Sequence, residues 1–134
     1  MAISWCLPDE QDAYLRLLAA LRAKRHEAIA PDIWWMELVN VLWVAERRGR
    51  MTATQTDAAL LFLRSLAVTI YPTTDEPCLD ATLALSRQYN LAAYDAAYLE
   101  LAVREQVLLA TIDTRLRNGA RSLNILLEDI SPES

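Results

Sequence analysis

Two aspartates, Asp95 and Asp113, are the residues whose types and spacing best suit chemistry. Asp95 lies near the start of a stretch with helical periodicity, residues 94–106, whose apolar stripe comprises Tyr94, Ala97, Tyr98, Leu101 and Ala102. Asp113 follows a short apolar run, residues 107–112, which is typical of a buried parallel strand. The helix would run about 18 Å, at roughly 1.5 Å per residue. The strand would then run back about 20 Å, at roughly 3.3 Å per residue, so the chain returns close to where the helix began. We therefore expect both carboxylates at the carboxyl edge of the strands, where open α/β sheets bind their ligands.

A third acid, Glu37, lies in a helix predicted over residues 31–48. From residue 33 to residue 45 every side chain is apolar except Glu37 and Asn40, so we expect this helix to be buried nearly all round. The two polar residues are three apart and share one face. A buried carboxylate needs a cation, a metal ion or a water-lined cleft beside it. Because the helix follows a predicted strand, residues 27–30, Glu37 should point toward the same edge as the two aspartates.

Each acid also has an ordinary structural explanation. Asp95 could cap a helix or stand in its first turn, where the helix dipole favours an acid. Asp113 could be the N-cap of the next helix, residues 114–121. Glu37 could pair with an arginine in the core. The expected convergence of all three at one edge favours a shared site.

Such an oxygen-rich site would bind a hard cation. Thr111 and Asn40 lie beside the three acids in the predicted arrangement, and oxygen-only clusters select Mg²⁺ or Mn²⁺. Packed carboxylates repel one another unless a cation lies between them. One or two such ions can activate water and stabilise the leaving oxygen of a phosphodiester. Three basic residues after Asp113 could contact substrate phosphates, although each also fits a solvent-exposed helix face: Arg115, Arg117 and Arg121.

The elements that must position these residues alternate between strand and helix, which predicts a parallel sheet layered by helices. The predicted strands cover residues 27–30, 66–71, 107–112 and 123–127. Residues 2–7 are interpreted as the end of a helix, and the other predicted helices cover residues 9–24, 31–48, 52–65, 78–89, 94–106 and 114–121. Gly49 and Asn90 are the predicted C-terminal stops of two of them.

Length and composition exclude several other classes. The 134 residues predict one domain, residues 1–134, and a hydrophobic content of 54% excludes a disordered chain. No apolar run approaches the ~20 residues that span a bilayer, and no signal-peptide pattern is present. Two cysteines, Cys6 and Cys78, suit a reducing compartment, so we expect a cytoplasmic protein with no membrane partner.

The charged residues and the missing motifs narrow the chemistry further. A net charge of −5 argues weakly against a protein that coats nucleic acid, but it allows an enzyme that engages nucleic acid through a local basic rim and metal ions. The chain has no glycine-rich phosphate loop and no dinucleotide fingerprint. Its one histidine, His26, argues against a catalytic triad or a histidine-based zinc site.

Four motifs resemble the PIN-domain ribonucleases, specifically the small toxins of the VapC type. The motifs are Trp5 to Glu10, Pro31 through Glu37 to Asn40, Tyr94 to Tyr98, and Leu109 to Asp113 with Leu116. The resemblance implies a three-layer α/β fold with a mainly parallel sheet flanked by helices. It also implies metal-dependent endoribonuclease activity on RNA, a cognate antitoxin protein that blocks the site, and a homodimer. By position it assigns metal-site roles to Glu37, Asp95 and Asp113, with Thr111 as a supporting neighbour.

The start of the chain departs from the family's pattern. The family opens with a strand that ends in an aspartate, whereas this chain opens with Met1-Ala2-Ile3-Ser4-Trp5. We therefore expect the sheet to lack the family's first strand and the site to lack its aspartate, which Asp9, at the far end of the helix, cannot replace. A start assigned too late or a truncated protein would explain the difference.

Two further hypotheses remain beside the ribonuclease. The first is a catalytically inactive, truncated PIN-like module that binds the antitoxin or self-associates. The second is an unrelated α/β binding domain whose acids are caps and surface pairs. The adjacent Trp34 and Trp35, which point to different faces of one helix, indicate a homodimer unless the core uses both.

Overall fold

The computed structural model describes residues 2–3, 28–111 and 113–127. The predicted helix over residues 9–24, the motif Trp5 to Glu10 and His26 lie outside these residues. The elements in chain order are β1 (Ala2–Ile3), β2 (Ala28–Pro31), α2 (Trp34–Arg47), α3 (Ala53–Arg64), β3 (Val68–Tyr71), α4 (Glu76–Tyr89), α5 (Ala93–Glu105), β4 (Leu109–Ala110) and α6 (Thr114–Ser122). This alternation confirms the predicted α/β class.

The sheet is parallel, and its four strands lie in the order β3-β2-β1-β4. All four residues of β2 and both residues of β4 are buried, as a parallel sheet covered on both faces requires. The predicted strand over residues 123–127 is reduced to a parallel bridge between Leu109 and Leu126. The backbone of Leu109 holds this bridge through hydrogen bonds with Ile125 and Leu127.

The N-terminal residues correct one expectation. Ala2–Ile3 form a strand, where we expected the end of a helix, and this strand pairs with both β2 and β4 in the middle of the sheet. The position of the family's first strand is therefore filled. The physical reason is that β2 and β4 would otherwise face each other with unpaired backbone groups, which a strand between them satisfies. No aspartate accompanies this strand, since the first acid in the sequence is Asp9.

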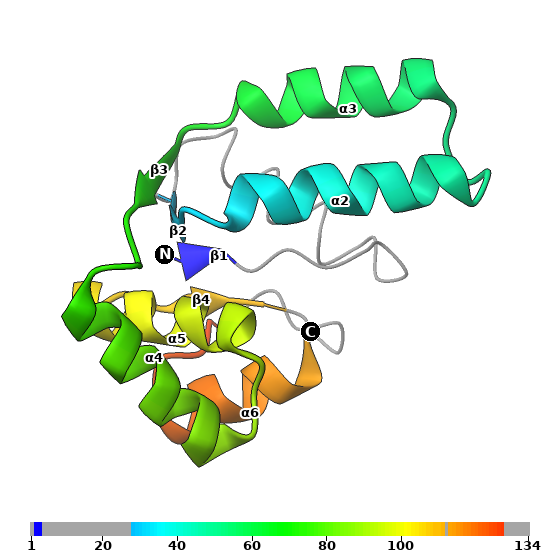
Figure 1. Cartoon of the computed structure of the whole chain (residues 1–134). Helices are drawn as coiled ribbons and strands as arrows, with labels where there is room; N and C mark the ends of the chain where they lie inside the picture. Colours follow the sequence, from blue (N-terminus) through cyan, green and yellow to red (C-terminus); the bar gives the residue numbers. More distant parts are fainter. Residues whose placement is uncertain (1, 4–27, 112, 128–134) are drawn as a thin grey trace.

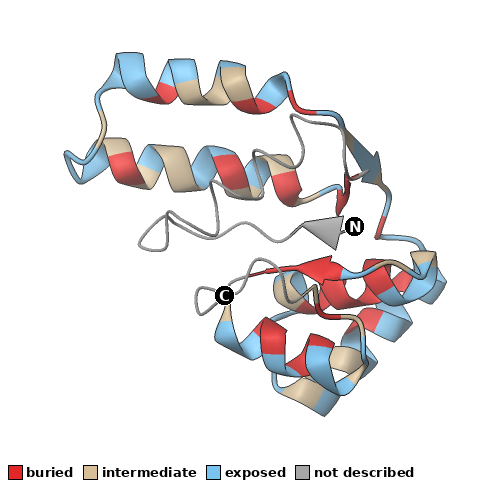
Figure 2. Ribbon diagram, turned by 180° about the vertical axis from the view of Figure 1, so that it is seen from behind, coloured by how far each residue is buried: buried red, intermediate tan, exposed pale blue. Residues whose placement is uncertain are grey.

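Helices lie on both sides of the sheet (Figure 1). The antiparallel pair α2 and α3 lies on one side, and α4, α5 and α6 gather on the other. Helix α5 packs against β1, β2 and β4 and against both α4 and α6. It is consequently buried without a break from Ala96 to Ala102, rather than along a single stripe. The red segments of Figure 2 show that buried residues gather where the helices face the sheet.

Local sequence signals explain where several helices begin and end. Thr52 caps α3 in a reciprocal capping box with Gln55, and Asp75 caps α4 by accepting a hydrogen bond from the backbone N–H of Cys78. The cap at Asp75 moves the start of α4 two residues ahead of the predicted position. Gly49 and Asn90 both adopt positive φ, at 74° and 53°, which confirms them as helix stops.

Helix α2 is less buried than we expected. Only Trp34, Leu38 and Ala45 are buried, whereas Met36 and Trp43 are 71% and 52% exposed. The reason is that α2 packs on α3 and on the core along one face, and an apolar sequence does not by itself provide a cover for the opposite face. Trp34 and its neighbour Trp35 both contribute to the core, with their rings edge to face at 4.7 Å, so this pair does not indicate a dimer.

Candidate functional site

Three helix starts bring the predicted acids to the carboxyl edge of the sheet. Helix α2 follows β2 and carries Glu37 in its first turn, and α6 follows β4 and begins at Asp113. Helix α5 runs back along the sheet before β4, so its first turn, with Asp95, lies at this edge too. The there-and-back path inferred from the lengths of the helix and the strand thus describes how the chain runs.

The carboxylates are close enough to influence one another electrostatically. Burial raises the pKa of Asp95, the negative charge of Asp113 raises it further, and the guanidinium of Arg115 acts in the opposite direction. Burial also raises the pKa of Glu37, where a hydrogen bond from Tyr98 lowers it and the charge of Asp95 raises it. The acids therefore form a line of electrostatic influence, in which Asp113 acts on Asp95 and Asp95 acts on Glu37.

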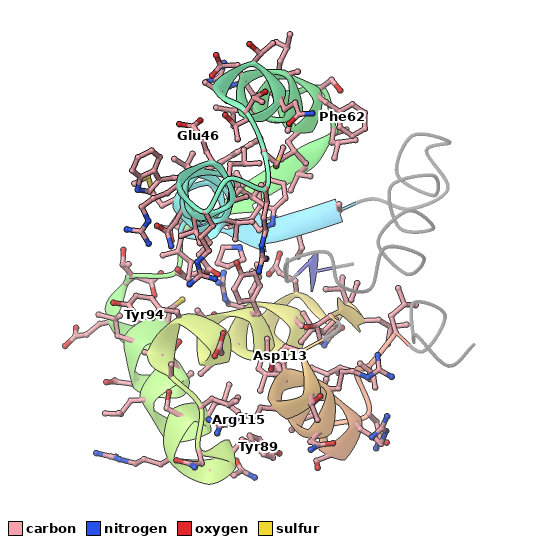
Figure 3. All side chains as sticks on the ribbon, turned by 90° about the vertical axis from the view of Figure 1, so that its right-hand side faces the viewer. Glu46, Phe62, Tyr89, Tyr94, Asp113 and Arg115 are labelled. Carbon is pink, nitrogen blue, oxygen red and sulfur yellow. The ribbon has the colours of Figure 1, made fainter. Side chains whose placement is uncertain are left out.

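Asp113 has a capping role in addition to its place in this line. Its Oδ1 accepts a hydrogen bond of 3.0 Å from the backbone N–H of Leu116, and its own backbone N–H donates to Thr111 Oγ1 at 3.1 Å. The ordinary explanation of Asp113 as an N-cap is thus present in the structure. Its Oδ2 accepts no hydrogen bond from the described residues, so a cap and a ligand can be the same side chain. Figure 3 labels Asp113 and Arg115 at the start of α6.

Glu37 is held by Tyr98, which the sequence placed in an apolar stripe and in a family motif but not among the site residues. The hydroxyl of Tyr98 donates to Glu37 Oε1 at 3.0 Å, and Tyr98 is 1% exposed. No described arginine pairs with Glu37, so the alternative of a core Glu–Arg pair does not apply to this part of the chain. The sequence did contain a signal for this role of Tyr98. A buried tyrosine hydroxyl needs a hydrogen-bond partner, and Tyr98 lies one helical turn after Asp95, on the same face.

The supporting residues have different surroundings. Thr111 is fully buried, holds the backbone N–H of Asp113 through its hydroxyl, and accepts a hydrogen bond from Arg117 at its carbonyl. Arg117 is buried, and its guanidinium is used within the fold, so we do not carry it forward as a phosphate contact. Asn40, one turn beyond Glu37, is exposed, as are Arg115 and Arg121.

The donor chemistry fits a hard divalent cation, although the arrangement is not a closed cage. The carboxylate oxygens are donors of the kind that such a cation prefers. A cation between the carboxylates would also offset the cost of their partial burial and the repulsion between their charges. Among residues 28–111 and 113–127, no three acidic, histidine or cysteine side chains form a group that could hold a metal ion. A single ion bound by Glu37, Asp95 and Asp113 together therefore requires these side chains to move closer.

Fold and site together define a class of small α/β domains that collect carboxylates at the ends of parallel strands. The chain belongs to the PIN domain family, whose sequence profile matches residues 2–122. PIN domains are typically metal-dependent nucleases, so membership supports a nuclease-type hydrolase function and RNA binding. It likewise supports the use of divalent metal ions in general.

Comparison with solved structures supports the same fold. The crystal structure of PAE2754 from Pyrobaculum aerophilum matches with a TM-score of 0.68 and 18% sequence identity, over 91% of this chain and 84% of that one. No curated protein sequence matches the chain. In the described residues, no helix combines the length and apolar character that crossing a membrane requires.

Proposed function

We propose that this chain is a Mg²⁺- or Mn²⁺-dependent endoribonuclease toxin of the VapC type, neutralised by a cognate antitoxin. The observation that carries the proposal is the electrostatically coupled line of Glu37, Asp95 and Asp113 at three helix starts of a PIN domain. The charge of Asp113 raises the pKa of Asp95 and that of Asp95 raises the pKa of Glu37, and a cation bound between the acids would replace this repulsion by attraction.

The roles of the residues follow from their contacts. Glu37, Asp95 and Asp113 would hold the cation, which when bound supplies Lewis-acid activation of water and neutralises charge on the phosphodiester. Thr111 and the capping hydrogen bond to Leu116 hold Asp113 in place. Arg115, exposed and close enough to Asp95 to lower its pKa, would contact a substrate phosphate at the same edge.

A second candidate function is an inactive PIN-like module that binds a protein partner. One observation favours it: the part of the chain that the structure describes contains no ready-made group of three metal-ligating side chains. The first eight residues, which include the central strand, also carry no acid that could supply a further ligand. Such a module would bind its partner without metal-dependent cleavage of RNA.

Protein partners are part of both proposals. Met36, Val39 and Trp43 recur along one face of α2 and are all exposed, which supports a protein–protein interface on this helix. We propose that the antitoxin or a second copy of the chain uses exposed apolar surface of this kind. A cytoplasmic location is proposed from the sparse cysteines, of which Cys78 is a buried free thiol.

The proposed function is tested with purified protein and a mixed RNA pool, with Mn²⁺ or with a chelator. Wild type should cleave with Mn²⁺ only, and Asp95→Asn should abolish cleavage. Asp80→Asn, which changes an exposed acid on α4, is the matched control and should cleave like wild type. If wild type neither cleaves RNA nor binds Mn²⁺ in calorimetry, the ribonuclease proposal is wrong and the binding module is favoured.

A further inference from the structure

One hydrogen bond connects the two sides of the fold at the candidate site. Tyr98 belongs to α5, which packs on the sheet and on α4 and α6, whereas Glu37 belongs to α2, which packs mainly on α3. The bond from the Tyr98 hydroxyl to Glu37 Oε1, at 3.0 Å, therefore spans helices from opposite layers. The position of Glu37 relative to Asp95 depends on how these two layers are held together.

The same helix carries both an acid of the site and the group that holds another acid. Tyr98 lies three residues after Asp95, so both lie on neighbouring positions of one helix face. The ring of Tyr98 is buried in the core, where it is fixed by packing. The hydroxyl is consequently a rigid donor at a defined place relative to Asp95.

We propose that Tyr98 is a positioning residue, whose hydroxyl holds the Glu37 carboxylate near Asp95, so that a cation can draw the two acids together. A glutamate side chain has several rotatable bonds and would turn away from a neighbouring negative charge if nothing held it. The hydrogen bond occupies Oε1, and no other described residue donates to Glu37, which leaves Oε2 for a cation as far as this part of the chain shows. Partners that orient metal ligands in this way typically change metal affinity or activity by roughly 10–100-fold when they are removed.

This inference rests on the proposed function and is tested by Tyr98→Phe, which removes the hydroxyl and keeps the ring. Mn²⁺ affinity by calorimetry should fall by about tenfold or more, and kcat for RNA cleavage should fall with little change in KM. Tyr89→Phe is the matched control, because the hydroxyl of Tyr89 accepts a hydrogen bond from its neighbour Gln88 and donates to none of the three acids in the described residues. In a Glu37→Gln background, Tyr98→Phe should cause no further loss of Mn²⁺ affinity.

The outcomes separate this inference from the function on which it rests. Equal Mn²⁺ affinity and equal kcat in wild type and Tyr98→Phe would overturn the positioning role alone. An absence of Mn²⁺ binding in wild type would overturn the proposed function and the positioning role together. If Tyr98→Phe is less stable than wild type, Mn²⁺ affinity can still be compared through the rise in Tm that Mn²⁺ causes in each of the two proteins. An equal rise in both would again overturn the positioning role.

Discussion

Asp113 combines two roles that substitution can separate. Its Oδ1 caps α6 by accepting from the backbone N–H of Leu116 at 3.0 Å, and its charge acts on Asp95. Asparagine is as good an N-cap as aspartate but carries no charge, whereas alanine removes both the cap and the charge. Asp113→Asn should therefore lose metal binding with an intact fold, and Asp113→Ala should lose metal binding and stability together.

The expected magnitudes follow from these contacts. Losing the cap costs about 1 kcal/mol, which corresponds to a fall in Tm of roughly 3–5 °C for a domain of this size. In Asp113→Asn, the lost attraction between the charge and the helix dipole, about 0.3–1 kcal/mol, is offset by relief of the repulsion with Asp95. Mn²⁺ at about 100 times its Kd should add about 2.7 kcal/mol to wild type, or roughly 8–13 °C, and neither variant should show this rise.

Differential scanning calorimetry of the three proteins, with and without Mn²⁺, measures both effects. The matched control is Asp75→Ala, which removes the cap of α4 and should lower Tm while leaving the response to Mn²⁺ intact. A full Mn²⁺ response in Asp113→Asn would refute the ligand role of Asp113. A metal-free Asp113→Ala protein as stable as wild type would refute the capping argument.

Three further predictions concern stability. Arg104→Met leaves the buried Glu100 without its hydrogen bonds of 2.8 and 3.2 Å. The free energy of unfolding in urea should fall by about 1–3 kcal/mol, which is below the usual range for buried pairs because Arg104 is partly exposed. An unchanged urea midpoint would contradict this. Gly119→Ala places a Cβ at 3.0 Å from Leu99 Cδ1. The overpacking cost of about 1–3 kcal/mol should exceed the gain of about 1 kcal/mol in helix propensity, so Tm should fall. A higher Tm would show that the core adjusts to the added methyl group. The pKa of Glu37 is raised in the fold, so the folded protein binds its proton more tightly than the unfolded chain does. The free energy of unfolding of the metal-free protein should therefore fall as pH rises from the ordinary pKa of 4.5 through the raised pKa. Glu37→Gln should flatten this fall, and parallel pH profiles of the two proteins would contradict the assignment.

Local features were predictable because they depend on residues close in sequence. The helices α3, α5 and α6 were predicted to within a few residues, and Gly49 and Asn90 were predicted as the stops of α2 and α4. The strands β2 and β3 were predicted for the same reason, from short apolar runs between helices. Even the arrival of Asp95 and Asp113 at one edge followed from two lengths, because a helix and a parallel strand that run in opposite directions return the chain to where it began.

The tertiary structure decided what depends on partners distant in the chain. The central strand β1 owes its conformation to open positions on both β2 and β4, which no local pattern in residues 2–3 encodes. The apolar sequence of α2 indicated burial, yet Met36 and Trp43 are exposed because burial requires another element to cover that face. The bond from Tyr98 to Glu37 joins residues of different layers, so it exists only once the helices have packed on the sheet. Sequence therefore determined which side chains could perform chemistry, and packing determined which groups hold them in place.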